Sequence, residues 1–345
     1  MKLEIIEEID GEIAHFYEPC TSTNLFSKAN TFFGMLNGEP FKFTVSISPK
    51  KKAFTIFRYT RRLLRLDKSS AIFNHKKDGI IVLYQGSIYF YDLKRRKLEI
   101  AGQLRQCRNV LHSGIAVTKN GIYFGEYGAN VDREPVPVWK SLDDGRSWSV
   151  VYEFSAGKIK HVHGVYHDKF TNDLWIPTGD FAGECFLVNV SKENFDNLTF
   201  FGDGTQNWRP VSLFFDEKKI YWGMDTQLET SYLQVFDRST KEIKKGQEFP
   251  GPVWYSKQFT DNLAILATTV EIGPGSKINN ANIYGSTNFL IWSELKSFRK
   301  DLLPKRFFKF GVISFADGQQ DSTDFVMHGE ALTKFDGKIL KARIE

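Results

Sequence analysis

Short runs of apolar residues, each preceded by a polar turn, recur along the chain and end in a small or polar residue and an acid or amide. The copies end at the following positions: Gln85, Glu126, Asp180, Asp225, Glu271 and, more weakly, Glu330. Successive ends are 41 to 59 residues apart, values that lie around the length of a propeller blade, about 40–50 residues, with room for insertions in the longer repeats. The pattern therefore predicts a repeated β-structure.

Further strands are predicted on both sides of these runs. One precedes the turn, as at Ser113–Val117 and Val211–Phe215, and one or two follow, as at Tyr232–Phe236 and Glu242–Lys245. Four strands per repeat, joined by short polar turns, are typical of a β-propeller. Helical periodicity, which an α-solenoid would require, is missing. We expect an all-β fold, a β-propeller of six or seven four-stranded blades, with Phe41–Leu66 as the source of a seventh.

We expect residues 1–345 to form a single propeller domain. The N-terminal segment 1–40 is a candidate for contributing to ring closure. Apolar residues make up 41% and aromatic residues 15% of the chain, enough for a sizeable core of half-buried strands. The copy that ends at Glu271 is expected to begin with a turn at Asp261-Asn262.

One turn carries a specific motif. The segment from Ser141 to Trp148, SLDDGRSW, matches the pattern S-x-D-x-G-x-[ST]-W at every position, and Ser286–Trp292 is a shorter relative. The motif resembles the Asp box of the BNR repeat, found in sialidases and other glycan-acting propellers. We expect its Ser and Asp to satisfy backbone donors of the turn, and its Gly to allow a positive φ. We also expect its Trp to pack between blades. Asp143, Gly145 and Trp148 are thus expected to be structural.

The resemblance implies a sialidase-like propeller rather than a sialidase. Sialidases carry an F/Y-R-I-P motif that supplies one of three arginines for a carboxylate. This chain has Phe57-Arg58-Tyr59-Thr60 instead, and no arginine triad is evident. Sialidase-like propellers include both hydrolases and lyases, so either chemistry is implied by the resemblance.

Polar residues occupy equivalent positions in successive repeats. The residues before the early strand are His112, His163 and Arg209, and those at the end of the next strand are Glu126, Asp180, Asp225 and Glu271. Equivalent positions of a propeller converge in space, so these side chains are expected to share a site at the central channel. The alternative is that these polar side chains lie at solvated strand ends and share no site.

Two histidines stand out within this set. In a strand, His161 and His163 point to the same face. Two imidazoles on one face can bind a divalent metal, with His112 from the neighbouring repeat as a further ligand. They can equally act as general acid and base near neutral pH.

These residues suggest an enzyme acting on an acidic glycan. Hydrolysis would use two of the acids Glu126, Asp180 and Asp225. β-Elimination would use His163 as base and Tyr127 as acid, with Arg209 or a metal neutralising the sugar carboxylate. Substrate binding is assigned to Arg209, Trp208 and Glu271, although Trp208 could instead belong to the core. The alternative function is a non-catalytic propeller that binds a glycan or a protein.

Charge and cysteine content limit the partners and the cellular location that we expect for this protein. The net charge is +5, and no nucleic-acid-binding motif accompanies the basic residues. Three widely spaced cysteines indicate no disulfide framework. The acidic N-terminus does not resemble a signal peptide, and no apolar window approaches the length of a membrane span. We therefore expect a cytoplasmic protein with no nucleic-acid or membrane partner; the oligomeric state is not indicated.

Overall fold

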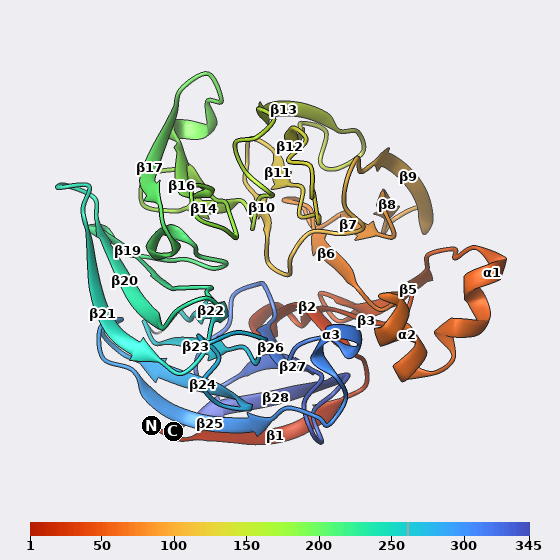
Figure 1. Ribbon diagram of the computed structural model, residues 1–345. Coiled ribbons are helices and arrows are strands. Elements are labelled where there is room, and N and C mark those ends of the chain that lie inside the picture. The colour runs from red at the N-terminus through yellow and green to blue at the C-terminus, as the bar shows by residue number, and fades with distance from the viewer. Residues whose placement is uncertain (261) are drawn as a thin grey trace. The chain divides into compact units, whose positions relative to one another are not determined.

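The computed structural model describes residues 1–260 and 262–345 and contains seven four-stranded antiparallel sheets, the blades of a β-propeller (Figure 1). The prediction of six or seven blades is confirmed, and the number is seven. The predicted turn at Asp261-Asn262 lies partly outside the described residues. Two compact units divide the chain: Met1–Lys68, Gln227–Ser231 and Gln247–Glu345 form the first, and Ser69–Thr226 and Tyr232–Gly246 form the second.

The first unit holds three sheets and three short helices. Its sheets are β2 (Ile13–Glu18), β3 (Thr23–Lys28), β4 (Thr31–Leu36) and β5 (Glu39–Thr44); β22 (Val253–Gln258), β23 (Ala264–Thr268), β24 (Asn280–Ser286) and β25 (Ser293–Arg299); and β26 (Val312–Phe315), β27 (Phe325–Glu330), β28 (Lys338–Ile344) and β1 (Leu3–Ile9). Its helices are α1 (Pro49–Lys52), α2 (Arg58–Leu64) and α3 (Lys305–Phe308), with 3₁₀ turns η1 (Pro19–Thr21) and η2 (Ala53–Thr55).

The two ends of the chain meet in one sheet. Strand β1 pairs antiparallel with β28, and the Lys2 amide donates a hydrogen bond of 2.8 Å to the Glu345 carbonyl. Figure 1 shows the two termini side by side. The N-terminal strand therefore completes a blade whose other three strands are C-terminal.

The seventh blade does not come from Phe41–Leu66, so that prediction was wrong. After β5 the chain turns helical, and the additional blade is β2–β5. Its strand β3 contains only two large apolar residues, Leu25 and Phe26, and so lacks the apolar run of the other repeats. A hairpin signal was present: Asn37-Gly38, with φ of 50° and 84°, is the favoured sequence of a two-residue turn.

The second unit holds most of four sheets. These are β6 (Ser69–Phe73), β7 (Gly79–Tyr84), β8 (Ser87–Asp92) and β9 (Lys97–Gln103); β10 (Ile115–Val117), β11 (Ile122–Gly125), β12 (Val136–Ser141) and β13 (Ser149–Phe154); β14 (Tyr166–Asp168), β15 (Asp173–Pro177), β16 (Cys185–Val190) and β17 (Leu198–Gly204); and β18 (Phe214–Phe215), β19 (Lys219–Gly223), β20 (Ser231–Asp237) and β21 (Ile243–Phe249). The 3₁₀ turns η3 (Ser191–Glu193) and η4 (Gln206–Trp208) belong to it.

Neighbouring sheets of this unit pack through apolar side chains. One buried cluster joins Tyr123 and Val138 of the sheet β10–β13 to Leu174 and Val188 of the sheet β14–β17. The apolar runs recognised in the sequence are the second strands of their sheets, such as β7, β11, β15 and β19. These strands are apolar nearly throughout because both of their faces are covered.

The motif at Ser141–Trp148, which resembles an Asp box, forms the turn between β12 and β13; we call it the Asp-box turn. Asp143 Oδ1 accepts from the Ser147 amide (2.8 Å) and lies 2.9 Å from Ser141 Oγ. The Gly145 amide donates to Ser141 Oγ (2.8 Å), and Gly145 has a φ of +98°. The Trp148 ring packs tilted against Phe124, with centroids 4.9 Å apart, and against an apolar cluster shared by the sheets β6–β9 and β10–β13. The structural roles expected from the sequence are confirmed for this turn.

The shorter relative of the motif forms a related turn between β24 and β25. Asn288 Oδ1 accepts from the amides of Leu290 and Ile291 at 3.0 and 2.9 Å. Trp292 Nε1 donates to the Phe289 carbonyl at 3.2 Å. Asn can therefore take the place of Asp in this turn, because its side-chain oxygen accepts the same amide hydrogens.

In the described part of the chain, no helix is long and apolar enough to cross a membrane.

Candidate functional site

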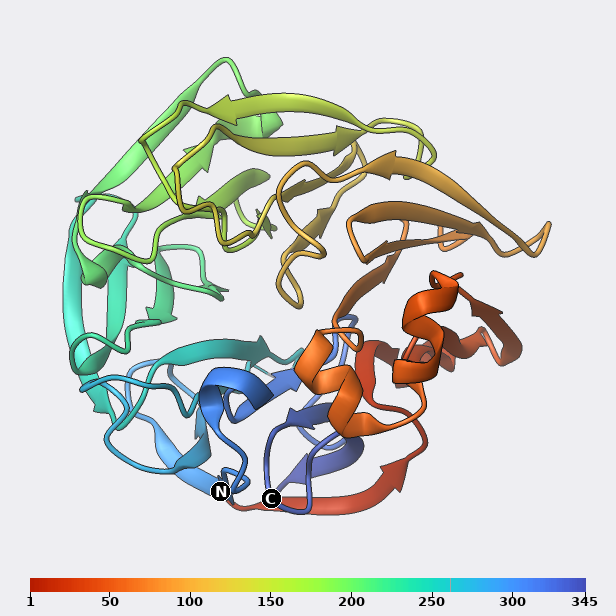
Figure 2. The same ribbon diagram turned by 45° about the vertical axis from the view of Figure 1, so that its right-hand side comes forward.

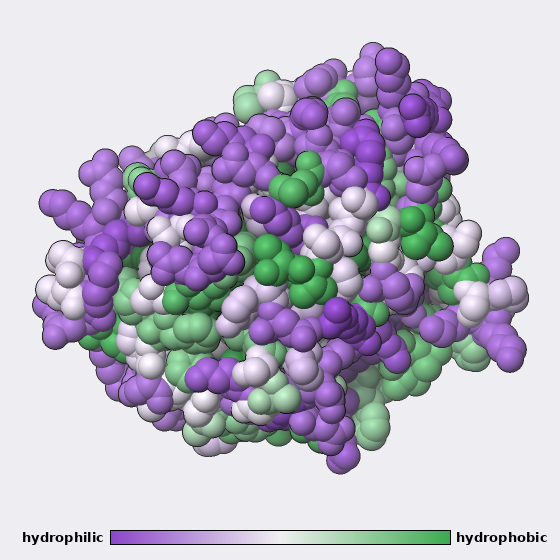
Figure 3. Space-filling view, turned by 90° about the horizontal axis from the view of Figure 1, so that it is seen from above, coloured by the Kyte–Doolittle hydropathy of each residue, from purple (hydrophilic) through white to green (hydrophobic). Residues whose placement is uncertain are grey.

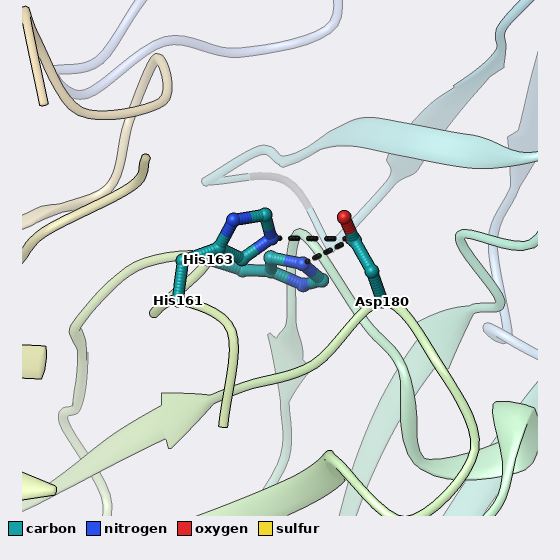
Figure 4. Close-up of side chains that lie close together, drawn as sticks. All are labelled: His161, His163 and Asp180. Atoms are coloured by element: carbon teal, nitrogen blue, oxygen red, sulfur yellow. Dashed lines mark hydrogen bonds and ion pairs between the residues drawn. The ribbon is translucent and has the colours of Figure 1, made fainter. Parts of the chain in front are cut away.

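His161 and His163 lie in the segment that leads into β14. Val162, between them, forms an isolated antiparallel bridge with Thr178, just after β15. Side chains alternate along such an extended segment. Val162 is therefore fully buried in the apolar core, whereas the two imidazoles share the opposite side and approach Asp180 (Figure 4).

Both imidazoles converge on one carboxylate oxygen. Nε2 of His161 lies 3.2 Å, and Nε2 of His163 lies 3.4 Å, from Asp180 Oδ1. The three residues are 2%, 1% and 9% exposed, respectively. Within residues 1–260 and 262–345, these three form one group whose ligand atoms lie within 4.8 Å of one another. We call it the histidine cluster.

Backbone carbonyls determine the tautomer of both rings. Nδ1 of His161 is 2.8 Å from the Gly128 carbonyl oxygen, and Nδ1 of His163 is 2.7 Å from that of Pro210. A carbonyl oxygen can only accept, so each Nδ1 carries a hydrogen, and Nε2 of a neutral ring presents a lone pair. Two lone pairs and a carboxylate oxygen thus face one another, an arrangement that a shared cation stabilises.

Two cationic side chains reach the same carboxylate. Lys160 Nζ is 2.5 Å from Asp180 Oδ2. Arg209 Nη2 is 2.9 Å from Asp180 Oδ1 and 3.2 Å from Asp225 Oδ2. Gln206 holds the guanidinium through a 3.1 Å hydrogen bond from Arg209 Nη1. Arg209 therefore bridges acids that follow β15 and β19, in neighbouring sheets.

Burial and the neighbouring charges shift the pKa values of Asp180 and His161. Burial opposes ionisation of Asp180, but hydrogen bonds that the His161 and His163 rings would donate when protonated, together with the Arg209 guanidinium, more than offset it, so the pKa of Asp180 lies well below its usual value. Burial lowers the pKa of His161, against the attraction of Asp180. An ionised Asp180 cannot serve as the general acid of a glycosidase, which needs a raised pKa.

Two of the three distances within the cluster suit a divalent metal ion. For a tetrahedral ion with ligands at about 2.0–2.1 Å, adjacent ligand atoms are about 3.3 Å apart; the two N–O distances are 3.2 and 3.4 Å, and all three ligand atoms lie within 4.8 Å of one another. Metal-binding histidines characteristically donate their other ring N–H to a carbonyl, as both rings do here. His161, His163 and Asp180 would supply three ligands, the number typical of a catalytic zinc site.

Tyr127 also belongs to this neighbourhood. Its ring centroid lies 4.1 Å from that of His161 and 6.0 Å from that of His163. The residue is half-buried. The structure thus brings together six of the residues singled out in the sequence: Tyr127, His161, His163, Asp180, Arg209 and Asp225.

Two other candidates are engaged elsewhere. The Glu126 carboxylate accepts hydrogen bonds from the amides of Arg105 (2.8 Å) and Gln106 (2.6 Å) and from Trp139 Nε1 (2.9 Å), so it holds a loop in place. Trp208 is 8% exposed and packs 5.9 Å from Trp222 in the apolar core. For Trp208 this corresponds to the core alternative rather than to stacking on a sugar.

The last two candidates do not join the histidine cluster in the described residues. His112 is half-buried, and the position expected for it as a third metal ligand is taken by Asp180. Glu271 belongs to the first compact unit, where its carbonyl accepts from Lys305 Nζ at 2.9 Å.

Sequence reasoning missed Lys160, Gln206 and the two carbonyls that orient the rings. Lys160 directly precedes His161, so strand alternation would place it on the opposite face. The segment is extended only around the Val162 bridge, which lets Lys160 reach Asp180. The backbone carbonyls could not be predicted, because every residue has one and residue type does not indicate which carbonyl will meet a histidine.

Comparison with known proteins gives the fold but no family. No protein-family profile matches the sequence, and no curated protein matches it. Among solved structures, the chain resembles one in the Mitotic Checkpoint Complex (TM-score 0.59, 8% identity, 99% of this chain and 93% of that one). It also resembles the WD40 repeats of RRP9 (TM-score 0.56, 10% identity, 100% and 98% covered).

A third similar structure is the extracellular domain of BT4673 from B. thetaiotaomicron, with a TM-score of 0.58 and 10% identity, over 100% of this chain and 40% of that chain. At such identities the similarity shows the β-propeller fold alone. Neither the sialidase-like family nor an activity follows from it.

Proposed function

We propose that this chain is a carbohydrate-active, sialidase-like propeller that acts on an acidic glycan and holds a divalent metal ion at the histidine cluster. The observation that carries the proposal is the convergence of two Nε2 lone pairs on Asp180 Oδ1, at distances of 3.2 and 3.4 Å. The Asp-box turn between β12 and β13 supports the family assignment.

The tautomer of His163 limits this residue to one of two roles. Its Nδ1 hydrogen is given to the Pro210 carbonyl, so Nε2 is its one lone pair. His163 can therefore be a metal ligand or a general base, but not both. Because the ring is 1% exposed and faces two other ligand atoms, we assign it as a ligand.

The surrounding charges favour β-elimination over hydrolysis. A hydrolase needs one protonated and one ionised carboxyl, but Asp180 and Asp225 share Arg209 and Glu126 is engaged by a loop. A bound divalent ion would supply a Lewis acid for substrate oxygens. Arg209 and Lys160 would attract the sugar carboxylate. The Tyr127 oxygen would take the proton from the carbon beside that carboxylate and return a proton to the leaving oxygen, so that the elimination balances without a second base.

Elemental analysis by plasma mass spectrometry tests the metal site. Wild-type protein should contain near-stoichiometric metal, and His163→Ala should lose it. His167→Ala is the matched control, because His167 lies in the same segment, in β14, and outside the cluster. Absence of metal from wild type after incubation with Zn²⁺ or Mn²⁺ would remove the metal from the proposal.

A glycan screen tests the reaction. Uronate-containing polysaccharides should give an unsaturated product that absorbs in the ultraviolet, and Tyr127→Phe should abolish it without loss of metal. A product with a new reducing end but no unsaturation would indicate hydrolysis instead.

The second candidate is a non-catalytic propeller that binds a glycan or a protein. It is favoured by the similarity to propellers of the Mitotic Checkpoint Complex and of RRP9. Saturable glycan binding by wild type with no product, surviving in His163→Ala, would support this function over the enzyme.

A further inference from the structure

Helix α2 buries charged side chains and exposes apolar ones, the reverse of an ordinary surface helix. Arg61 and Arg62 are buried, at 5% and 0% exposure, while Phe57 before the helix and Leu63 and Leu64 at its end are 66%, 45% and 40% exposed. Surface helices of soluble proteins normally bury an apolar stripe and expose charge. The orientation of this helix therefore requires a separate explanation.

Ion pairs explain the inward face. Arg62 Nη1 lies 2.7 Å from Asp301 and 3.2 Å from Asp336, and Arg62 Nη2 donates to the Phe308 carbonyl of α3. Arg61 pairs with Glu12. Arg58 Nη1 lies 3.0 Å from Asp67. We call these residues the arginine cluster: Arg58, Arg61 and Arg62 with Glu12, Asp67, Asp301 and Asp336. They fix which side of α2 faces inward.

Several apolar side chains of the same segment are exposed to solvent. These are Phe54 (47% exposed), Ile56 (69%), Phe57 (66%), Tyr59 (62%), Leu63 (45%) and Leu64 (40%); we call them the apolar tip. All come from eleven consecutive residues. Figure 1 shows α1 and α2 standing out beyond β5, and Figure 2 shows both helices at the front when that side is turned forward.

A basic rim adjoins the apolar tip. Lys50, Lys51 and Lys52 of α1 are exposed, and residues 40–66 include no Asp or Glu. In Figure 3, hydrophobic atoms lie among hydrophilic ones at the right-hand edge, the side on which Figure 1 draws α1. Arg58, Arg61 and Arg62 are paired with acids of the arginine cluster, so they add little outward charge to that of the lysines.

From this juxtaposition we infer that the segment 49–64 is a docking element for an anionic phospholipid surface. The apolar tip enters the boundary between headgroups and acyl chains, and Lys50–Lys52 contact lipid phosphates. The element projects rather than forming a groove, so it suits insertion into a lipid layer better than reception of a peptide. Aromatic and aliphatic residues beside lysines, without acids, are the composition of interfacial segments.

This inference departs from the expectation that the chain has no membrane partner. That expectation considered segments long enough to span a bilayer, and a segment that lies in the interface needs no such length. The inference does not depend on the function proposed for the histidine cluster.

Flotation with lipid vesicles tests the inference. Full-length protein should bind vesicles of phosphatidylcholine mixed with phosphatidylserine, and not vesicles of phosphatidylcholine alone. Replacing Lys50, Lys51 and Lys52 by Gln should weaken binding about 100-fold, since each basic residue near an anionic surface contributes about fivefold. The double variant Ile56→Ser, Phe57→Ser should weaken it by about 100-fold or more.

The matched control removes equally exposed apolar residues outside the segment. Ile100→Ser with Ile291→Ser changes side chains that are 71% and 70% exposed and should leave binding unchanged. Serine at position 57 is a favourable N-cap for α2, so the segment should keep its fold. The inference is overturned if wild type fails to bind anionic vesicles, or if the double variant binds as well as wild type. It is also overturned if sedimentation shows a dimer that the double variant converts to monomer.

Discussion

The arginine cluster and the histidine cluster are both buried and charged, but their charges are balanced in different ways. In the arginine cluster, guanidinium donors meet carboxylate acceptors, as Arg62 meets Asp301 and Asp336. In the histidine cluster, two imidazole lone pairs face a carboxylate oxygen that Arg209 and Lys160 also approach. Matched pairs hold a segment in place. Converging acceptors are what the proposed cation site requires, so the two clusters contrast structural burial of charge with the functional burial that we propose.

The largest expected effect is loss of one partner from the arginine cluster. Arg62→Met removes a buried guanidinium from Asp301 and Asp336, which are 18% exposed and keep Lys300 and Arg58 as partners. The loss of these charged hydrogen bonds should lower the free energy of unfolding by about 3 kcal/mol. Urea denaturation measures it. Lys51→Met, at an exposed position of α1, is the control and should change stability little. A loss as small as that of the control would mean that the cluster does not hold α2.

Added metal should stabilise the protein through the histidine cluster and not through the arginine cluster. At a Zn²⁺ concentration of 100 times its Kd, metal-free wild type should gain about 2.7 kcal/mol in unfolding free energy. His163→Ala should gain none, because it loses a ligand, while Arg62→Met should gain as much as wild type. Thermal denaturation with and without metal measures both. An equal gain in His163→Ala would place the ion elsewhere.

Acid should weaken the histidine cluster through Asp180. Its pKa is depressed on folding, so its stabilising contribution is complete above the unfolded value of about 3.9. The contribution is lost as the pH falls below that value. Asp180→Asn should cost about 2 kcal/mol at neutral pH and should flatten the acid limb of the stability profile.

The control for the acid experiment is Asp10→Asn, whose side chain is 80% exposed beside Lys28. It should leave the acid limb as in wild type. An unchanged acid limb in Asp180→Asn would show that Asp180 does not titrate differently on folding.

The smallest effect is expected at the Asp-box turn, which belongs to neither cluster. Asp143→Ala removes the acceptor for the Ser147 amide and hydroxyl and should cost about 1 kcal/mol, without changing metal content. Leu142→Ala, 74% exposed in the same turn, is its control. Metal loss in Asp143→Ala would contradict a purely structural role.

The repeat positions predicted which side chains would meet, within limits. His163 and Arg209 occupy one repeat position, and Asp180 and Asp225 occupy another. The four side chains come together because the two repeats form neighbouring sheets. Glu126 occupies such a place too, yet its carboxylate is taken by the amides of Arg105 and Gln106. Equivalence in the repeat locates the backbone of a residue, but the loop that happens to lie beside it decides where its side chain goes.

Residue pattern alone determined the β-propeller, the Asp-box turn and the shared side of His161 and His163, because each depends on local alternation or turn chemistry. Only the tertiary structure decided three further features. It selected the Gly128 and Pro210 carbonyls that set the ring tautomers, built the seventh blade from β2–β5, and turned α2 with its arginines inward. Each of these depends on partners distant in the chain, such as Asp301 and Asp336 for Arg62. No periodicity within a segment encodes such partners.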